Sequence, residues 1–266
     1  MNPIPVLMYH SVHPRPPRAT AALSVHPRAF ADQMGLLRER GFTPVPFSAL
    51  GDGPVPPRPV VVTFDDGYAD FHRHALPVLD DLGFTATVFA TTGWLADAGP
   101  DAAGRPLDAM LSWGQVREAA EHGVEFGAHS HSHPQLDQLG GAALRDELAR
   151  SRGLLEDRLG RAVTTMAYPY GYSSARVRRA VRAAGYGSAC AVANRTASLD
   201  ARGDPLAVPR LTVGRGTSLD TFARVVDGAG LGRVYLREHA LTKGYAVVRR
   251  ARYGVRAGLR KAAGRD

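Results

Sequence analysis

The sequence predicts an α/β protein with one (β/α) barrel over residues 1–231 and a basic tail over residues 232–266. Candidate strands and helices alternate roughly seven times with short connections, which is typical of a parallel sheet. Polar motifs follow several different strands instead of gathering at one crevice, which favours a barrel over an open sheet. We therefore expect a closed or nearly closed barrel of about seven strands.

The strand over residues 60–68 is the clearest of the series. It reads Val-Val-Val-Thr-Phe-Asp-Asp-Gly-Tyr, and a continuous β-branched run of this kind suits a strand buried on both faces. Shorter apolar runs bounded by glycine, proline or polar residues indicate the other strands. In chain order, the expected strands cover residues 5–12, 45, 60–68, 85–90, 124–128, 163–168, 186–192 and 206–213.

Helical segments are expected between these strands. In the first of them, Phe30, Met34 and Leu37 recur near helical spacing, and Gly41 follows as a stop. A later helix is expected to begin at Ser112 as its cap and to end before Gly123. The expected helices cover residues 24–40, 71–82, 112–122, 139–159, 174–184 and 218–226, and residues 93–110 are expected to form a surface loop.

Composition indicates an ordinary globular protein. Hydrophobic residues make up 44% of the chain and charged residues 22%, and the single cysteine, Cys190, excludes an intrachain disulfide. The N-terminal stretch lacks a basic segment followed by a long apolar one, and no later stretch is long and apolar enough to span a membrane. A cytoplasmic protein is therefore the default expectation, although a chain trimmed of a signal would read the same way.

The net charge of +8 lies entirely in the tail. From Arg233 onward there are ten lysines or arginines and two acids, while the remaining residues hold 23 of each sign. Basic residues interleaved with aromatic and aliphatic ones suit an amphipathic helix on an anionic membrane surface, peripheral to its inner face. No recognition motif for nucleic acid accompanies this charge, so no nucleic-acid partner is expected. A solvated basic tail is the alternative, and the oligomeric state stays open.

Asp65 and Asp66 end the strand over residues 60–68, at the edge where α/β folds place their chemistry. Neighbouring residues of an extended chain point to opposite sides, so one carboxylate can hold a metal while the other transfers protons. The alternative is an ordinary Asp-Asp-Gly turn.

A histidine-rich stretch follows the strand over residues 124–128. His129 and His133 are four residues apart, which places both imidazoles on one side if the segment takes one helical turn. Two imidazoles and one carboxylate form a set of three ligands that leaves open positions on a metal such as zinc. His131 would point away, in a supporting or surface role.

The strand over residues 163–168 is followed by Pro169, Tyr170 and Gly171. Proline and glycine fix a turn here, and the backbone N–H of Tyr170 could stabilise an oxyanion if it lies within hydrogen-bond distance. The alternative is a rigid aromatic turn that packs on the barrel rim.

These three motifs together resemble the first three motifs of the polysaccharide deacetylase family, carbohydrate esterase family 4. The motifs are Thr63-Phe64-Asp65-Asp66-Gly67, His129-Ser130-x-x-His133-Pro134 and Tyr168-Pro169-Tyr170-Gly171, and the resemblance covers roughly residues 3 to 227. It implies a distorted (β/α) barrel that removes N- or O-acyl groups from sugars with one divalent metal, most simply zinc, with cobalt and nickel as alternatives. It also implies that Asp65 is the catalytic base and that Asp66, His129 and His133 hold the metal.

Two departures from the family pattern lead to further predictions. Ala167 stands where the third motif usually has an arginine that orients the base, so we expect Arg210 to orient Asp65 instead. The late Leu-x-His motif that supplies a general acid is also missing. Members that open with a Met-Tyr-His strand resemble a permuted version, in which His10 takes this role; the alternative is a capped histidine at a strand end.

The expected function is removal of the N-acetyl group from an N-acetylated polysaccharide, oligosaccharide or lipid-linked saccharide. In this scheme Asp65 takes a proton from water, the Tyr170 N–H stabilises the oxyanion and His10 protonates the leaving amine. Substrate contacts are assigned to Tyr9, Tyr168 and Pro169. The alternatives are an O-deacetylase, a deacylase of a small non-sugar amide and a catalytically silent barrel that binds carbohydrate.

Overall fold

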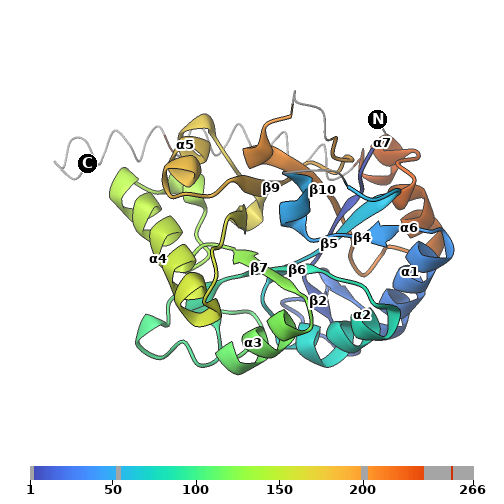
Figure 1. The fold of residues 1–266 in the computed structure, drawn as a ribbon, viewed down its shortest axis with the longest axis horizontal. Coiled ribbons are helices and arrows are strands. Elements are labelled where there is room, and N and C mark those ends of the chain that lie inside the picture. The colour runs from blue at the N-terminus through green and yellow to red at the C-terminus, as the bar shows by residue number, and fades with distance from the viewer. Residues whose placement is uncertain (1–2, 52–54, 199–202, 237–252, 254–266) are drawn as a thin grey trace.

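A computed structural model describes residues 3–51, 55–198, 203–236 and 253. Its centre is a closed barrel of parallel strands in the spatial order β1-β10-β9-β8-β7-β6-β5, and pairing of β1 with β5 closes the ring (Figure 1). These strands are β1 (Val6–Tyr9), β5 (Pro59–Asp66), β6 (Thr87–Ala90), β7 (Glu125–Ala128), β8 (Thr165–Ala167), β9 (Ser188–Val192) and β10 (Val208–Thr212). The predicted α/β barrel of about seven strands is therefore confirmed.

Three short strands lie outside the ring. β4 (Thr43–Pro44) extends the sheet beside the start of β5, which places the strand expected at residue 45 just before that position. β2 (Ser11–Val12) and β3 (Ser24–Val25) form a separate parallel pair. The single strand expected over residues 5–12 is therefore divided, and His10 lies at the break between β1 and β2.

Helices surround the barrel and bury its outer face (Figure 1). They are α1 (Pro27–Glu39), α2 (Leu76–Leu82), α3 (Trp113–Glu121), α4 (Gly141–Leu159), α5 (Ala175–Ala183), α6 (Leu219–Val226) and α7 (Leu231–Val234). Ser112 begins α3 as expected, because its hydroxyl accepts from the Gln115 N–H while the Gln115 side chain accepts from the Ser112 N–H. The helix expected over residues 71–82 starts with a π-helical turn, Phe71–Ala75, and only then becomes α2.

Short 3₁₀ turns make up much of the remaining chain. They are Phe47–Leu50, Thr92–Trp94, Gly99–Asp101, Leu136–Gln138, Pro169–Gly171 and Pro205–Ala207. The expected irregular loop over residues 93–110 contains the end of the Thr92–Trp94 turn and the whole of the Gly99–Asp101 turn. Within the described ranges, none of the helices is long and apolar enough to cross a bilayer.

Alternation along β5 explains where its side chains point. Val60, Val62 and Phe64 belong to the large core between the barrel and its helices, whereas Val61 belongs to the core inside the barrel. Because side chains of a strand alternate between its two faces, Asp65 shares the inner face with Val61. The carboxyl end of β5 therefore presents Asp65 at the mouth of the barrel.

The expected tail lies mostly outside the described residues. Its first residues pack on the barrel, because Tyr235 is buried and its hydroxyl donates to the Thr212 carbonyl at 2.8 Å. Further along, the Tyr253 ring lies under the guanidinium of Arg176 on α5, with 4.8 Å between the guanidinium carbon and the ring centroid.

Candidate metal and catalytic site

Three expected metal ligands converge at the carboxyl end of the barrel. One ligand atom from each of Asp66, His129 and His133 lies within 4.8 Å of the others. The Nε2 atoms of His129 and His133 lie 3.5 and 3.2 Å from Asp66 Oδ1. Asp66 and His129 are buried, and the side chain of His133 is 11% exposed. The cluster is therefore shielded from bulk water but keeps one side near the surface.

Backbone conformation, and not a helical turn, brings the two imidazoles together. The segment after β7 has no helical residues at this point, so the helical turn that would place both imidazoles on one side is absent. Instead Ser130 and His133 adopt positive φ angles of 63° and 60°, and Asp66 adopts 73°. Left-handed conformations are costly for residues other than glycine, and they are retained where the surrounding structure enforces them. In this conformation the His129 and His133 rings lie 5.0 Å apart.

The hydrogen bonds of the cluster fit a metal cation. His129 Nδ1 lies 2.9 Å from the Ala167 carbonyl and donates to it, so Nε2 presents a lone pair toward Asp66. Burial lowers the pKa of His129 to about 4, which makes the neutral imidazole the stable form at pH 7. Asp66 Oδ1 is buried and receives no aligned hydrogen bond from the described part of the chain. A cation bound between these lone pairs would satisfy all three side chains.

Asp65 lies beside the cluster and forms a two-bond ion pair with Arg210. Arg210 Nη1 and Nη2 donate to Asp65 Oδ1 and Oδ2 at 2.6 and 2.7 Å, and both side chains are almost wholly buried. Nη1 also donates to Thr63 Oγ1 at 3.1 Å, which fixes the plane of the guanidinium. Burial opposes ionisation of Asp65, but the charge and the hydrogen bonds of Arg210 outweigh it and lower the pKa of this carboxyl. Asp65 is therefore an ionised, oriented carboxylate.

The position of Arg210 follows from the register of the last strand. Val208 on β10 packs on the core inside the barrel, and Leu211 belongs to the outer core, so Arg210 points inward. The structure thus brings Arg210 to Asp65 as the sequence predicts. That Arg210 orients a catalytic base remains a prediction about function.

His10 follows β1 directly and lies near the same carboxylates. β1 and β5 pair in parallel with Tyr9 opposite Phe64, so His10 comes next to Asp65 in the register. A positive charge on His10 lowers the pKa of Asp66, although it is not the main influence there, and it acts in the same direction on Asp65. His10 Nδ1 is buried and has no hydrogen-bond partner among the described residues. That His10 donates a proton to a substrate stays a prediction.

Aromatic side chains enclose His133. The rings of Trp94 and Tyr170 lie 4.7 and 4.8 Å from the His133 ring, and Tyr170 is 52% exposed. The expected turn is present, with Tyr170 at φ 60° and Gly171 at φ 71°. Trp94 is not predicted from the sequence, because it ends a short 3₁₀ turn, Thr92–Trp94, that has no apolar periodicity. Its position just after a strand end is the signal that could have indicated it.

Two of the expected substrate contacts, Tyr9 and Tyr168, are wrong because both side chains are buried in the core. Tyr9 points away from the barrel interior, is fully buried against Phe30 and Phe64, and donates to Gln33 Oε1 at 2.8 Å. Tyr168 is also fully buried, and its hydroxyl donates to the Leu206 carbonyl at 2.8 Å. Both tyrosines are core residues. Pro169 is buried within its turn, and its contact with substrate stays a prediction.

His131 is buried and lies outside the metal cluster. Its Nδ1 is 2.9 Å from Thr92 Oγ1, so the surface alternative for this histidine is wrong and a supporting role remains.

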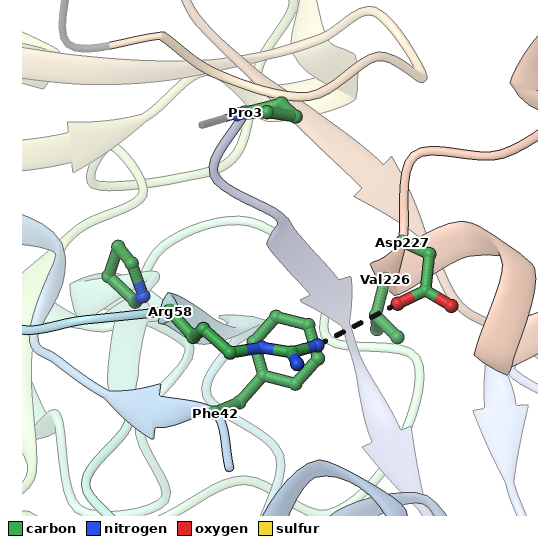
Figure 2. Close-up of a pocket in the computed structure, with 6 residues that line it drawn as sticks. Pro3, Phe42, Arg58, Val226 and Asp227 are labelled. Atoms are coloured by element: carbon green, nitrogen blue, oxygen red, sulfur yellow. Dashed lines mark ion pairs between the residues drawn. The ribbon is translucent and has the colours of Figure 1, made fainter. Parts of the chain in front are cut away.

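A separate hollow of about 260 Å³ lies at the opposite end of the barrel, where β5 begins. Figure 2 shows the Arg58 side chain over the Phe42 ring and paired with Asp227. The guanidinium carbon lies 4.6 Å from the ring centroid, and Nη2 lies 3.9 Å from Asp227 Oδ1. Arg40 shares the same carboxylate. These contacts join the C-terminal ends of α1 and α6 to the start of β5. The one carboxylate that lines the hollow, Asp227, is already paired with two arginines, and no histidine is among the lining residues.

The comparisons with known proteins agree with this geometry. The family profile described as Polysaccharide deacetylase matches residues 52–189. The chain is 27% identical over 231 residues to the Bacillus subtilis (strain 168) protein named "Putative polysaccharide deacetylase YxkH", covering 84% of this chain and 76% of the relative. It is 33% identical over 120 residues to the Escherichia coli (strain K12) Poly-beta-1,6-N-acetyl-D-glucosamine N-deacetylase, covering 41% of this chain but 18% of that relative. The solved structure of Streptococcus pyogenes deacetylase PplD in complex with acetate superposes with a TM-score of 0.74 at 26% identity, covering 84% and 98% of the two chains.

Proposed function

The chain belongs to the polysaccharide deacetylase family, and from this premise we propose that it is a metal-dependent hydrolase that removes the N-acetyl group from an N-acetylated sugar. One observation carries the proposal. An ionised carboxylate, Asp65, is oriented by Arg210 immediately beside the Asp66, His129 and His133 cluster. A base for water and a candidate cation site therefore lie side by side at the carboxyl end of the barrel, an arrangement suited to hydrolysis of an unactivated amide.

Asp66, His129 and His133 would hold the metal, which we propose to be zinc. Two neutral imidazole nitrogens and one carboxylate oxygen are ordinary zinc ligands, and three protein ligands leave a position for the reactants. When bound, the metal supplies Lewis-acid polarisation of the acetamide carbonyl and acidifies water. Cobalt and nickel are the competing outcomes of a metal analysis.

The side chains of this protein would then move the protons. Asp65 accepts the proton of the attacking water, and the bond to Arg210 keeps its lone pairs aimed at that water. The Tyr170 N–H is our proposed donor to the oxyanion, because the Pro169–Gly171 turn lies against the His133 ring. A protonated His10 would give its proton to the leaving amine, which is too basic to depart as an anion.

The substrate class rests on the relatives' names together with this chemistry. One relative is named as an N-deacetylase of poly-β-1,6-N-acetyl-D-glucosamine, so we propose a polymer or oligomer of N-acetylglucosamine as the first substrate to test. The half-exposed Tyr170 offers a ring face of the kind on which a sugar can pack.

The deciding experiment combines metal analysis with acetate release. Purified protein is stripped, reloaded with zinc, cobalt or nickel, and assayed on free, polymeric and lipid-linked N-acetylglucosamine and on O-acetylated sugars. We expect metal-dependent acetate release from an N-acetylated saccharide, lost in Asp65→Asn. Release by metal-free protein or by Asp65→Asn at the normal rate would overturn the mechanism, and activity confined to O-acetyl sugars would make the protein an O-deacetylase.

For the segment over residues 232–266 we propose binding to an anionic membrane surface, as at a cytoplasmic leaflet. Its ten basic residues among aromatic and aliphatic ones support this, and each basic residue near such a surface contributes about 1 kcal/mol. Co-sedimentation with phosphatidylserine vesicles, with and without residues 237–266, tests it. Equal binding by the two proteins would refute it.

A further inference from the structure

The segment that carries the two histidine ligands is tied to α4 by one carboxylate. Glu147 Oε2 accepts from the backbone N–H groups of His131 and Ser132 at 2.8 and 2.9 Å. Glu147 Oε1 accepts from the Ser132 hydroxyl as well. A single half-buried side chain thus receives three hydrogen bonds from two consecutive residues, both of them between the histidine ligands in the chain.

The opposite edge of this segment is held by the chain that follows β6. The Gly93 N–H donates to the His131 carbonyl at 2.8 Å, and the Thr92 N–H donates to the Ser130 carbonyl at 3.4 Å. A Cβ atom at residue 93 would lie 2.7 Å from the His131 oxygen, so glycine is required for this close approach. The carbonyl groups of Ser130 and His131 thus accept from the chain that follows β6. The N–H groups of His131 and Ser132 donate to Glu147 on α4.

These contacts act on a conformation that the chain would otherwise avoid. Ser130 and His133 lie on either side of the two residues that Glu147 binds, and both have positive φ. Non-glycine residues in this region relax when the contacts that enforce them are removed. Relaxation at His133 would move its imidazole away from Asp66, whose Oδ1 now lies 3.2 Å from His133 Nε2.

From this geometry we propose that Glu147 is a positioning residue for the metal site: it holds the segment from His129 to His133 in the conformation that aims both imidazoles at Asp66. The inference rests on the proposed function, because it concerns the affinity of that cluster for a metal. Glu147 itself is not a ligand in this scheme, since its two oxygens are occupied by the N–H and O–H donors.

The packing of α4 does not depend on Glu147. The side of α4 that faces the core is formed by Leu144, Leu148, Ser151 and Leu155, all buried, whereas Glu147 lies at the edge of that side. Its neighbour Asp146 is exposed and carries the same charge on the same turn of helix. Asp146→Asn is therefore a matched control for the loss of one negative charge.

The test measures zinc binding by metal-stripped protein in competition with a chelating dye, and records the visible absorption of the cobalt-loaded protein. We expect Glu147→Ala to raise the zinc Kd by roughly 10- to 100-fold, the range found when groups that orient a ligand are removed. The cobalt absorption should change in intensity at the same time. Glu147→Gln should fall between wild type and alanine, since its amide oxygen still accepts from both N–H groups, and Asp146→Asn should match wild type.

Two results would be decisive against the inference. If Glu147→Ala binds zinc as tightly as Asp146→Asn does, the carboxylate does not position the ligands. If wild type binds neither zinc nor cobalt, the proposed function fails instead. In that event the imidazole ¹⁵N spectra of the metal-free proteins still test the positioning role, which requires the His133 signals to shift in Glu147→Ala and not in Asp146→Asn. If the alanine variant does not fold, the glutamine variant carries the same comparisons.

Discussion

Replacing Arg210 by methionine isolates the strongest interaction in the site. The variant removes a guanidinium that is 0% exposed and leaves its partner, Asp65, buried and charged. Removing one member of a buried pair costs roughly 3–5 kcal/mol, because the remaining charge has lost its compensation. For a protein of this size that corresponds to a fall in Tm of roughly 6–20 °C. Differential scanning calorimetry on the metal-free proteins measures it directly.

The same substitution should change the pH dependence of stability in a defined direction. In wild type the folded-state pKa of Asp65 is lowered, so its contribution to stability is present above the unfolded value of about 3.9 and is lost as pH falls through the folded pKa. In Arg210→Met, burial becomes the leading influence on the pKa of Asp65, and burial raises this pKa because it disfavours the charged carboxylate. The difference in stability between the two proteins should therefore be large at pH 7 and should shrink below about pH 4.

Activity provides the second readout. A base that is neither oriented nor held ionised should lose most of the roughly 10²- to 10⁴-fold that general base catalysis contributes to turnover. The acidic limb of kcat/KM should also move to higher pH. The double variant Asp65→Asn with Arg210→Met, which has no buried charge at this pair, should recover most of the lost stability while staying inactive. Unchanged turnover in Arg210→Met, or a double variant no more stable than the single one, would refute the reasoning.

Three further outcomes are expected. In Gly171→Ala, the added Cβ atom would lie 2.5 Å from the Val192 side chain, at a residue with positive φ. We expect the free energy of unfolding, measured by chemical denaturation, to fall by about 1–3 kcal/mol and kcat to fall because the turn is displaced; wild-type stability would contradict this. His10→Gln should lower turnover of N-acetyl substrates by roughly 10²-fold while leaving zinc affinity unchanged, and equal losses on a good-leaving-group acetyl ester would argue against a proton donor. Removal of metal by a chelator should abolish acetate release reversibly. Gly153→Ala, at an open position inside α4, is the control for Gly171→Ala; it should keep wild-type turnover and be as stable as wild type or about 1 kcal/mol more stable.

The barrel and its main residues could be predicted from the sequence because both depend on periodicity and on strand ends. Asp65 and His129 each follow a continuous apolar run. To predict them as site residues, only the rule that parallel strands carry functional polar groups at their carboxyl ends is needed. A barrel that closes then brings those ends together without any knowledge of loops. Arg210 could be predicted from a similar pattern, since it is a charged residue within an otherwise largely apolar strand.

The residues that could not be predicted depend on backbone detail that sequence patterns do not encode. Tyr9 and Tyr168 are expected to contact substrate, but the alternation of side chains along each strand places both tyrosines in the core. The histidine spacing suggested a helical turn, whereas positive φ at Ser130 and His133 produced the same convergence. In the sequence Glu147 cannot be distinguished from an exposed charged residue of a helix, because its role depends on the loop residues His131 and Ser132 that donate to it.

The closure of the barrel also fixes the order in which the site is completed. β1 lies between β5 and β10, and Leu7 pairs with Leu211, about two hundred positions later in the chain. During synthesis from the N-terminus, the strand that carries Asp65 emerges long before the one that carries Arg210. Without β10 the ring of strands would have two open edges, and Asp65 would lack its arginine partner. The last barrel strand in the chain therefore has two roles in the finished structure, because it closes the ring and also brings Arg210 to Asp65.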